Sequence, residues 1–343
     1  MLSKLFDRYN DFINKNKDLI PEFIHIPLTE KQNSFQYVGG QISNGNLYSI
    51  INSSEKMFVY NISDNKMGFV GNFDKTDFKW TGGCIYDNNL YAFPRSENSL
   101  LKYCPETDSF EKIPCDFKYE NEHHYGGICT NEGVIYQPPR NTNHILKWDI
   151  KNRMCKKIEI NNGQTARYCG SVIHPNGYAY FIPEKDFCVI KMDLKTEKTE
   201  SIGVPLPCMA FDPVVAPDGN IYGFRATGGG IVKIDTSNDT VSLLHEECII
   251  RAYGTKNGIN GKLYSLPGYT GDVWEFDPLT GELKKCYSLN EKEKVYYAGG
   301  AIDLDGNIYA IPVHADNILK ISFEKYKINI PSDIYNAFFK DFY

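Results

Sequence analysis

The sequence predicts an all-β fold, a seven-bladed β-propeller with short terminal helices, from three observations. A common pattern recurs seven times along the 343 residues, at intervals of 42–45 residues. Within each repeat, short apolar runs alternate with turn dipeptides such as Asp218-Gly219 and Asn260-Gly261, which favour β-hairpins. The chain also contains 24 Tyr and 20 Phe, which supply apolar surface for a large core. Four short strands per repeat make one propeller blade, so the seven repeats predict seven blades around a channel.

Two columns of the repeat have a structural interpretation. The second Gly of a Gly-Gly pair, or the residue in its place, falls at Gly40, Gly83, Gly127, Gly170, Pro213, Thr255 and Gly300. The inner strands of a propeller crowd the axis and leave little room for a Cβ atom, which favours glycine there. A tyrosine on the following strand recurs at Tyr48, Tyr91, Tyr136, Tyr180, Tyr222, Tyr264 and Tyr309. We expect these tyrosines to pack between blades.

The flanks of the repeats divide the chain into residues 1–34, the propeller over 35–330, and residues 331–343. Apolar residues recur at helical spacing over 2–17 and again over 334–342, where Ser332 is a candidate N-cap. These helices either pack on the propeller or on each other, or they offer a docking surface for a protein partner. The outer strand of the last blade is either FIHIPL (23–28) or KYKINI (325–330).

Charge and cysteine usage narrow the location and the partners. A net charge of −6 argues against general nucleic-acid binding. The chain has no run of about 18 apolar residues, the length that a membrane-spanning helix needs, and its N-terminus lacks the apolar core of a signal peptide. The ten cysteines include no CxxC pair, which argues against a structural zinc site and favours a reducing compartment. We therefore expect a cytoplasmic protein without a metal or cofactor.

Arginine placement predicts the functional site. The chain has 30 Lys but only seven Arg, and five of the arginines fall in loops of five successive blades: Arg95, Arg140, Arg167, Arg225 and Arg251. These loops precede the first strand or follow the second strand of a blade. Because consecutive strands are antiparallel, both kinds of loop emerge on the same face. The five arginines are therefore predicted to form an arc on one rim of the channel.

Other side chains in the same loops complete the predicted site: Lys79, Trp80, His124, Tyr297 and His314. Arginine binds carboxylates and phosphates in bidentate fashion, and aromatic rings offer a flat surface to a sugar or a base. Acids in these loops provide a structural alternative, because Glu97, Glu184, Asp186 and Asp316 could pair with the arginines. His123, His124 and His144 all belong to the third repeat and could converge at its edge.

The Gly-Gly strand, the IYxxP strand and the ILKID strand resemble Kelch-type propellers and the propeller of virginiamycin B lyase and its relatives. The resemblance covers residues 35–330 and concerns structural motifs. For the lyases it implies a catalytic histidine and a metal-binding acid near this rim, without assigning either role to a residue of this sequence.

Three functions follow from the sequence. The first is a non-catalytic binding propeller that captures an anionic small molecule or an acidic peptide segment on the arginine-rich rim. The alternative is a cytoplasmic lyase acting on acidic sugars or a related anionic substrate, in which an arginine neutralises the substrate carboxylate while a histidine or tyrosine takes a proton. The third is an architectural repeat protein. No complete catalytic motif is present in the sequence, and a propeller fold serves enzymes and binding proteins alike.

Overall fold

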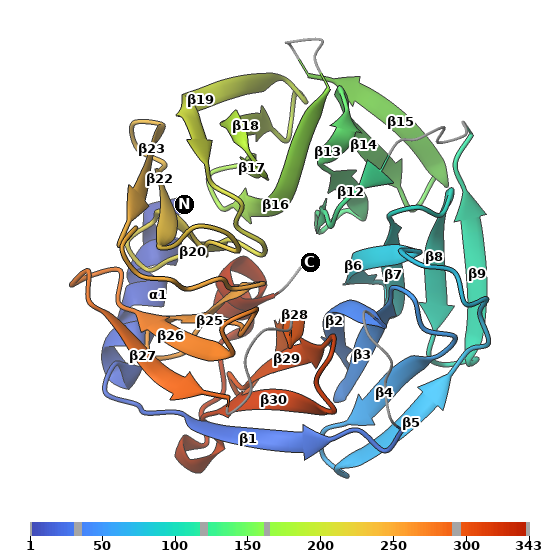
Figure 1. The fold of residues 1–343 in the computed structure, drawn as a ribbon, viewed down its shortest axis with the longest axis horizontal. Coiled ribbons are helices and arrows are strands. Elements are labelled where there is room, and N and C mark those ends of the chain that lie inside the picture. Colours follow the sequence, from blue (N-terminus) through green and yellow to red (C-terminus); the bar gives the residue numbers. More distant parts are fainter. Residues whose placement is uncertain (1, 31–35, 117–122, 161–164, 290–295, 341–343) are drawn as a thin grey trace.

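Seven β-sheets follow one another around a central axis in the computed structural model (Figure 1). The structure describes residues 2–30, 36–116, 123–160, 165–289 and 296–340. Each blade contains four antiparallel strands, with the first strand nearest the axis and the fourth at the periphery (Figure 1). The predicted seven-bladed β-propeller with short terminal helices is therefore confirmed.

The first four blades occupy the chain up to residue 207. The first blade contains β2 (Tyr37–Ser43), β3 (Asn46–Ile51), β4 (Met57–Asn61) and β5 (Lys66–Val70). The second contains β6 (Trp80–Tyr86), β7 (Asn89–Pro94), β8 (Ser99–Cys104) and β9 (Ser109–Pro114). The third contains β11 (Ile128–Cys129), β12 (Val134–Gln137), β14 (His144–Asp149) and β15 (Met154–Glu159). The fourth contains β16 (Ala166–His174), β17 (Tyr178–Pro183), β18 (Asp186–Asp193) and β19 (Thr199–Pro207).

The last three blades complete the ring. The fifth contains β20 (Val214–Val215), β21 (Ile221–Phe224), β22 (Ile231–Asp235) and β23 (Thr240–Leu244). The sixth contains β24 (Thr255–Asn257), β25 (Leu263–Ser265), β26 (Asp272–Phe276) and β27 (Leu283–Ser288). The seventh contains β28 (Tyr297–Ile302), β29 (Ile308–Pro312), β30 (Asn317–Ser322) and, at its outer edge, β1 (Glu22–Pro27).

Strand β1 closes the propeller. It runs antiparallel to β30 with Phe23 opposite Ile321, so the N-terminal of the two candidate segments supplies the outer strand (Figure 1). The other candidate, residues 325–330, begins within the 3-10 helix η1 (Glu324–Tyr326). Its next residue, Lys327, adopts the left-handed backbone conformation with φ 50°. A residue in that conformation interrupts an extended strand.

The third blade departs from the regular pattern because two prolines, Pro138 and Pro139, follow its second strand. Proline has no backbone N–H to donate to a sheet ladder, and β12 ends at Gln137, just before Pro138. The chain continues as β13 (Pro139–Thr142), which leaves its own blade and pairs with β10 (His123–His124) and with β16 of the fourth blade. This irregularity joins two neighbouring blades at one rim of the propeller.

The recurring tyrosines are confirmed as core residues. Their exposed fractions lie between 0 and 4%, for Tyr48, Tyr91, Tyr136, Tyr180, Tyr222, Tyr264 and Tyr309. They belong to hydrophobic clusters that contain residues of adjacent blades: Tyr309 shares a cluster with first-blade residues, and its ring lies 6.5 Å from that of Tyr60. All ten cysteines are free thiols, and six of them are buried, as expected for small apolar residues.

The terminal helices pack on each other and on the propeller, which is one of the two predicted alternatives. α1 (Leu2–Asn16) contacts the segment formed by α2 (Ser332–Ile334) and the π-helix η2 (Tyr335–Phe339). The Tyr9 and Phe338 rings stack at 4.0 Å, and the side-chain amide of Asn257 on β24 donates to the Phe338 carbonyl at 2.7 Å. Ser332 is the first helical residue and Pro331 occupies the N-cap position, so the predicted Ser332 cap is wrong. In the described part of the chain, no helix combines the length and apolarity needed to cross a membrane.

We expect the variant Gly170→Ala to lose about 3 kcal/mol of unfolding free energy. A Cβ atom at this position would lie 2.1 Å from the backbone oxygen of Ala210 in the next blade, far closer than van der Waals contact allows. Gly68→Ala is the matched control, because a Cβ atom there meets no heavy atom within 4 Å. Urea denaturation of both variants measures the effect. Equal stabilities would show that the glycine column does not report crowding at the axis.

Candidate functional site

The pairing of β13 with β16 places two predicted site residues side by side. Arg140 lies directly opposite Arg167 in the register of these two strands. The Nε atoms of Arg140 and Arg167 lie 3.3 and 3.2 Å from the same oxygen, Oε2 of Glu184. The two arginine side chains are 19 and 35% exposed, whereas that of Glu184 is 10% exposed. Two guanidinium groups that solvent can reach thus converge on one largely buried carboxylate.

A third arginine joins this group through an aromatic ring. The guanidinium carbons of Arg95 and Arg140 lie 4.9 and 4.8 Å from the centroid of the Tyr125 ring. Arg95 also lies 4.1 Å from the centroid of Phe78. Cations are attracted to the faces of aromatic rings, so Tyr125 holds the two guanidinium groups in place. We call Arg95, Arg140 and Arg167, with Glu184 and Tyr125, the arginine mouth.

Tyr125 also belongs to an apolar layer across the top of the channel. The layer combines residues from six of the seven blades: Val38, Tyr125, Cys169, Phe211, Tyr253 and Ala298. Side chains from so many blades meet in one cluster only at the axis. Ring centroids are 5.3 Å apart for Tyr125 and Phe211, and 5.0 Å apart for Phe211 and Tyr253. The arginine mouth therefore lies beside an aromatic floor, made by Tyr125, Phe211 and Tyr253, at the axis of the propeller.

Sequence reasoning missed this floor by one column of the repeat. It assigned the aromatic wall to the column of Trp80 and Tyr297, both of which are completely buried in the structure. The Trp80 indole donates to the Ser99 carbonyl at 2.9 Å, and the Tyr297 hydroxyl donates to Oδ1 of Asn317 at 2.6 Å. Successive side chains of a strand point to opposite sides, so the next column faces the axis. This alternation along the strand was the sequence signal that could have indicated the aromatic floor.

Two other predicted site residues, Lys79 and Arg225, are held by contacts within the fold. Lys79 is buried, and its Nζ donates to the carbonyls of Asp74 and Thr76 at 2.8 and 2.9 Å. Burial lowers the pKa of Lys79. Arg225 is 5% exposed and donates to the carbonyls of Pro207 and Gly229. Its guanidinium group fixes the loops of the fifth blade.

The remaining predicted site residues are Arg251, His314 and His124. Arg251 is exposed, has a left-handed backbone conformation with φ 52°, and packs its carbonyl against Gly268 of the sixth blade. His314 is half-buried in the loop after β29. The His124 ring is buried, hydrogen-bonds the Pro138 carbonyl through Nδ1 at 3.0 Å, and lies 5.5 Å from the ring of His144. Two of the three histidines expected to converge therefore do so, while the His123 side chain and that of Asp186 lie outside the described residues.

The opposite mouth of the channel is covered by the C-terminal helical segment. Figure 1 shows the C-terminal helical segment beside the inner strands of the sixth and seventh blades. Small cavities of 50 and 90 Å³ separate this segment from the inner strands. Over the described ranges, no cluster of three or more His, Cys, Asp or Glu side chains is arranged to hold a metal ion.

Comparisons with family models and with curated proteins give no match. Among solved structures, one of streptogramin B lyase aligns with a TM-score of 0.73 at 14% identity, covering 88% of this chain and 97% of the other. A catalytically inactive virginiamycin B lyase from Staphylococcus aureus, with quinupristin, aligns with a TM-score of 0.75 at 14% identity, covering 89% and 100%. A chain of the mitotic checkpoint complex aligns with a TM-score of 0.65 at 10% identity, covering 89% and 93%. These neighbours confirm the predicted resemblance to virginiamycin B lyase-like propellers at the level of the fold.

Proposed function

We propose that this propeller is a binding protein that holds an anionic small molecule or an acidic peptide segment at the arginine mouth. The observation that carries the proposal is the pairing of Arg140 with Arg167 around the carboxylate of Glu184. Like charges directly opposite each other on neighbouring strands destabilise a sheet. Among the described side chains, the Glu184 carboxylate offsets only one of these two positive charges. A bound anion would offset the second positive charge.

The surroundings of the pair support a ligand with both an anionic and an apolar part. Arginine presents a planar fork that matches the geometry of a carboxylate or a phosphate. The rings of Tyr125, Phe211 and Tyr253 beside the pair form an apolar floor. Tyr125 is itself largely buried, with 7% of its surface exposed. Tyr269, whose ring lies 5.6 Å from that of Tyr253, is 39% exposed and extends the aromatic surface outward. The ligand would place its anion between the arginines and its flat part against this surface.

Replacement of Arg140 or Arg167 by alanine should weaken anion binding about tenfold to a hundredfold, the usual range for one lost charge-assisted hydrogen bond. Galacturonate, inorganic phosphate and an aspartate-rich peptide are the probes, and isothermal titration calorimetry is the measurement. Arg153→Ala is the matched control, since Arg153 is an exposed arginine paired with Glu111 on the far side of the third blade. Equal affinities for the wild type, both mouth variants and the control would contradict the proposal.

The lyase alternative is favoured by one observation, the buried His124–His144 pair beside the arginine mouth. His124 follows His123, the register partner of Arg140, so an imidazole lies near a cation that could neutralise a substrate carboxylate. Elimination from a uronate creates a conjugated double bond that absorbs ultraviolet light. Incubation with oligogalacturonates tests this alternative directly. The binding proposal expects no increase in absorbance, and a rapid increase that Arg140→Ala abolishes would establish the lyase instead.

A further inference from the structure

A larger cavity lies on the face opposite the arginine mouth, between the third and fourth blades. Its volume is 620 Å³, within the range of small-molecule sites and far above the cavities beside the channel. Its lining comes from the turn between β11 and β12, from two turns of the fourth blade, and from Asn336 and Ala337 of the C-terminal helical segment. We call this cavity the interblade pocket.

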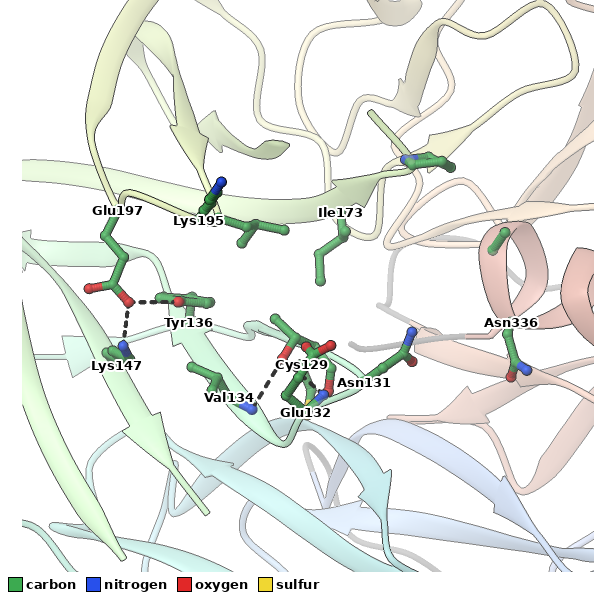
Figure 2. A pocket seen from close by; sticks show the side chains of 14 residues that line it. Cys129, Asn131, Glu132, Val134, Tyr136, Lys147, Ile173, Lys195, Glu197 and Asn336 are labelled. Atoms are coloured by element: carbon green, nitrogen blue, oxygen red, sulfur yellow. Dashed lines mark hydrogen bonds and ion pairs between the residues drawn. The ribbon is translucent and has the colours of Figure 1, made fainter. Parts of the chain in front are cut away.

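Two apolar walls face each other across the interblade pocket. Val134 and Cys129 belong to the third blade, whereas Ile173 and Leu194 belong to the fourth. Figure 2 shows Ile173 on one side of the opening and Val134 with Cys129 on the other. Because two neighbouring blades form these walls, we call the space between them the slot of the pocket. A slot with apolar walls fits a flat molecule, which buries both of its faces.

The charged side chains that line the interblade pocket sum to a net charge of zero. Glu132 and Glu197 are matched by Lys147 and Lys195. Within the slot, Glu197 accepts hydrogen bonds from the Tyr136 hydroxyl at 2.8 Å and from Lys147 (Figure 2). Burial alone would raise the pKa of Glu197, but these hydrogen bonds outweigh it and hold the pKa below its ordinary value. The carboxylate is thus neutralised internally, and the pocket offers no net attraction to an ion.

The opening of the interblade pocket carries two primary amides. Asn131 lies on the turn between β11 and β12 and extends toward the helical segment that carries Asn336 (Figure 2). Both residues are exposed. A primary amide both donates and accepts hydrogen bonds, so it pairs with another amide or with the edge of a nitrogen heterocycle.

We propose that the interblade pocket binds an uncharged, flat heteroaromatic molecule that carries an amide group. The ring system lies between the apolar walls, and its polar edge meets Asn131 and Asn336. This site is distinct from the arginine mouth in position and in ligand charge. Because Asn336 belongs to the C-terminal helical segment, occupation of the pocket also stabilises the docking of that segment on the propeller.

A matched pair of probes tests the charge preference. A quinoline carboxamide and the corresponding quinoline carboxylate have nearly the same shape and differ in charge. Ligand-observed NMR and calorimetry on the full chain should show the carboxamide bound at least about tenfold more tightly at the pocket, equivalent to about 1.4 kcal/mol. Absence of carboxamide binding to the wild type would overturn the proposal.

Two substitutions test the location. Asn336→Trp and Asn131→Trp fill the opening from opposite sides, and both positions are exposed, so folding tolerates the larger side chain. Each should weaken carboxamide binding at least about tenfold. Leu279→Trp is the control, because Leu279 is 62% exposed and occupies the turn in the sixth blade that corresponds to the turn of Leu194. Carboxamide binding that neither pocket variant weakens, or a loss of carboxylate binding equal to the loss of carboxamide binding, would overturn the inference.

Discussion

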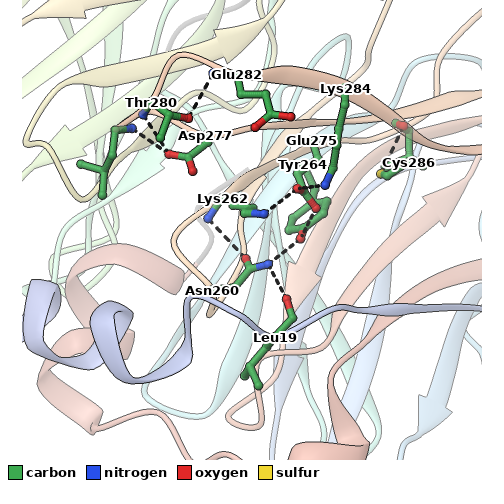
Figure 3. A network of polar contacts seen from close by, with 12 residues as sticks. Leu19, Asn260, Lys262, Tyr264, Glu275, Asp277, Thr280, Glu282, Lys284 and Cys286 are labelled. Carbon is green, nitrogen blue, oxygen red and sulfur yellow. Dashed lines mark hydrogen bonds and ion pairs between the residues drawn. The ribbon is translucent and has the colours of Figure 1, made fainter.

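Replacement of Tyr264 by alanine should lower the unfolding free energy by about 3–5 kcal/mol, the cost of a large cavity in a core. Tyr264 is completely buried between the sixth and seventh blades, where it contacts Phe323. Its hydroxyl donates to Oε2 of Glu275 at 2.8 Å and contacts the Asn260 amide at 2.8 Å (Figure 3). The substitution therefore removes both the ring and a partner of a largely buried carboxylate.

A second variant, Tyr264→Phe, separates the contribution of the ring from that of the hydroxyl and its polar network. Glu275 also accepts hydrogen bonds from Lys262 and Lys284 at 2.9 and 3.0 Å (Figure 3). Burial alone would raise the pKa of Glu275, but its hydrogen bonds outweigh burial, so the pKa lies below its ordinary value. Tyr264→Phe keeps the ring and should cost only about 1–2 kcal/mol. Chemical denaturation measures both variants, with the 39% exposed Tyr269→Ala as control. A loss for Tyr264→Ala no larger than that of the control would contradict an interblade role for this column.

The second large effect concerns an ion pair in the wall of the channel. Lys256 on β24 pairs with Asp212, and their side chains are 0 and 6% exposed. Lys256→Met should lower the unfolding free energy by about 3–5 kcal/mol, because it removes the cation that Lys256 supplies to the buried Asp212 carboxylate. These residues stand in the fifth and sixth repeats, where Pro213 and Thr255 replace the second glycine of the pair. The ion pair thus joins two blades in which the second glycine of the pair is absent.

Two further variants distinguish a lost ion pair from a poor side-chain fit. Asp212→Asn combined with Lys256→Met removes both charges and should restore more than half of the lost stability. Lys284→Met removes an exposed cation, 52% exposed, from Glu275 and should cost at most about 1 kcal/mol. Urea denaturation compares the three proteins. A double variant less stable than Lys256→Met would show that the pair does not behave as a coupled unit.

The fold was predictable because its determinants repeat, whereas the site depends on exceptions to the repeat. Seven copies of the glycine and tyrosine columns specify blade number and core, since each copy solves the same packing problem. The arginine mouth arises because Pro138 and Pro139 divert one strand onto the next blade, which places Arg140 opposite Arg167. Sequence position alone also could not tell Arg225, whose guanidinium group fixes loops within the fold, from the arginines that solvent reaches. Burial is decided by the conformation of each loop, and five different repeats supply these loops.

The interblade pocket could be predicted from the sequence even less than the arginine mouth. Its lining residues come from two blades and from the C-terminal helical segment, which lies about 200 residues away along the chain from Asn131. No periodicity connects Asn336 to the turns of the third and fourth blades. The helical face over residues 334–342 was evident from the sequence, but the surface that it covers follows from tertiary packing, which the amphipathic pattern does not encode.

The central claim, that the arginine mouth binds an anion, is tested most directly by titrating one protein pair at two salt concentrations. Wild type and the double variant Arg140→Ala with Arg167→Ala are titrated with galacturonate and with an aspartate-rich peptide by calorimetry. We expect the wild type to bind at least one of these anions, with an affinity that falls as added salt screens the charges. We expect the double variant to retain its fold and lose that binding. Anion binding of equal strength in both proteins, or none in the wild type at low salt, would contradict the claim.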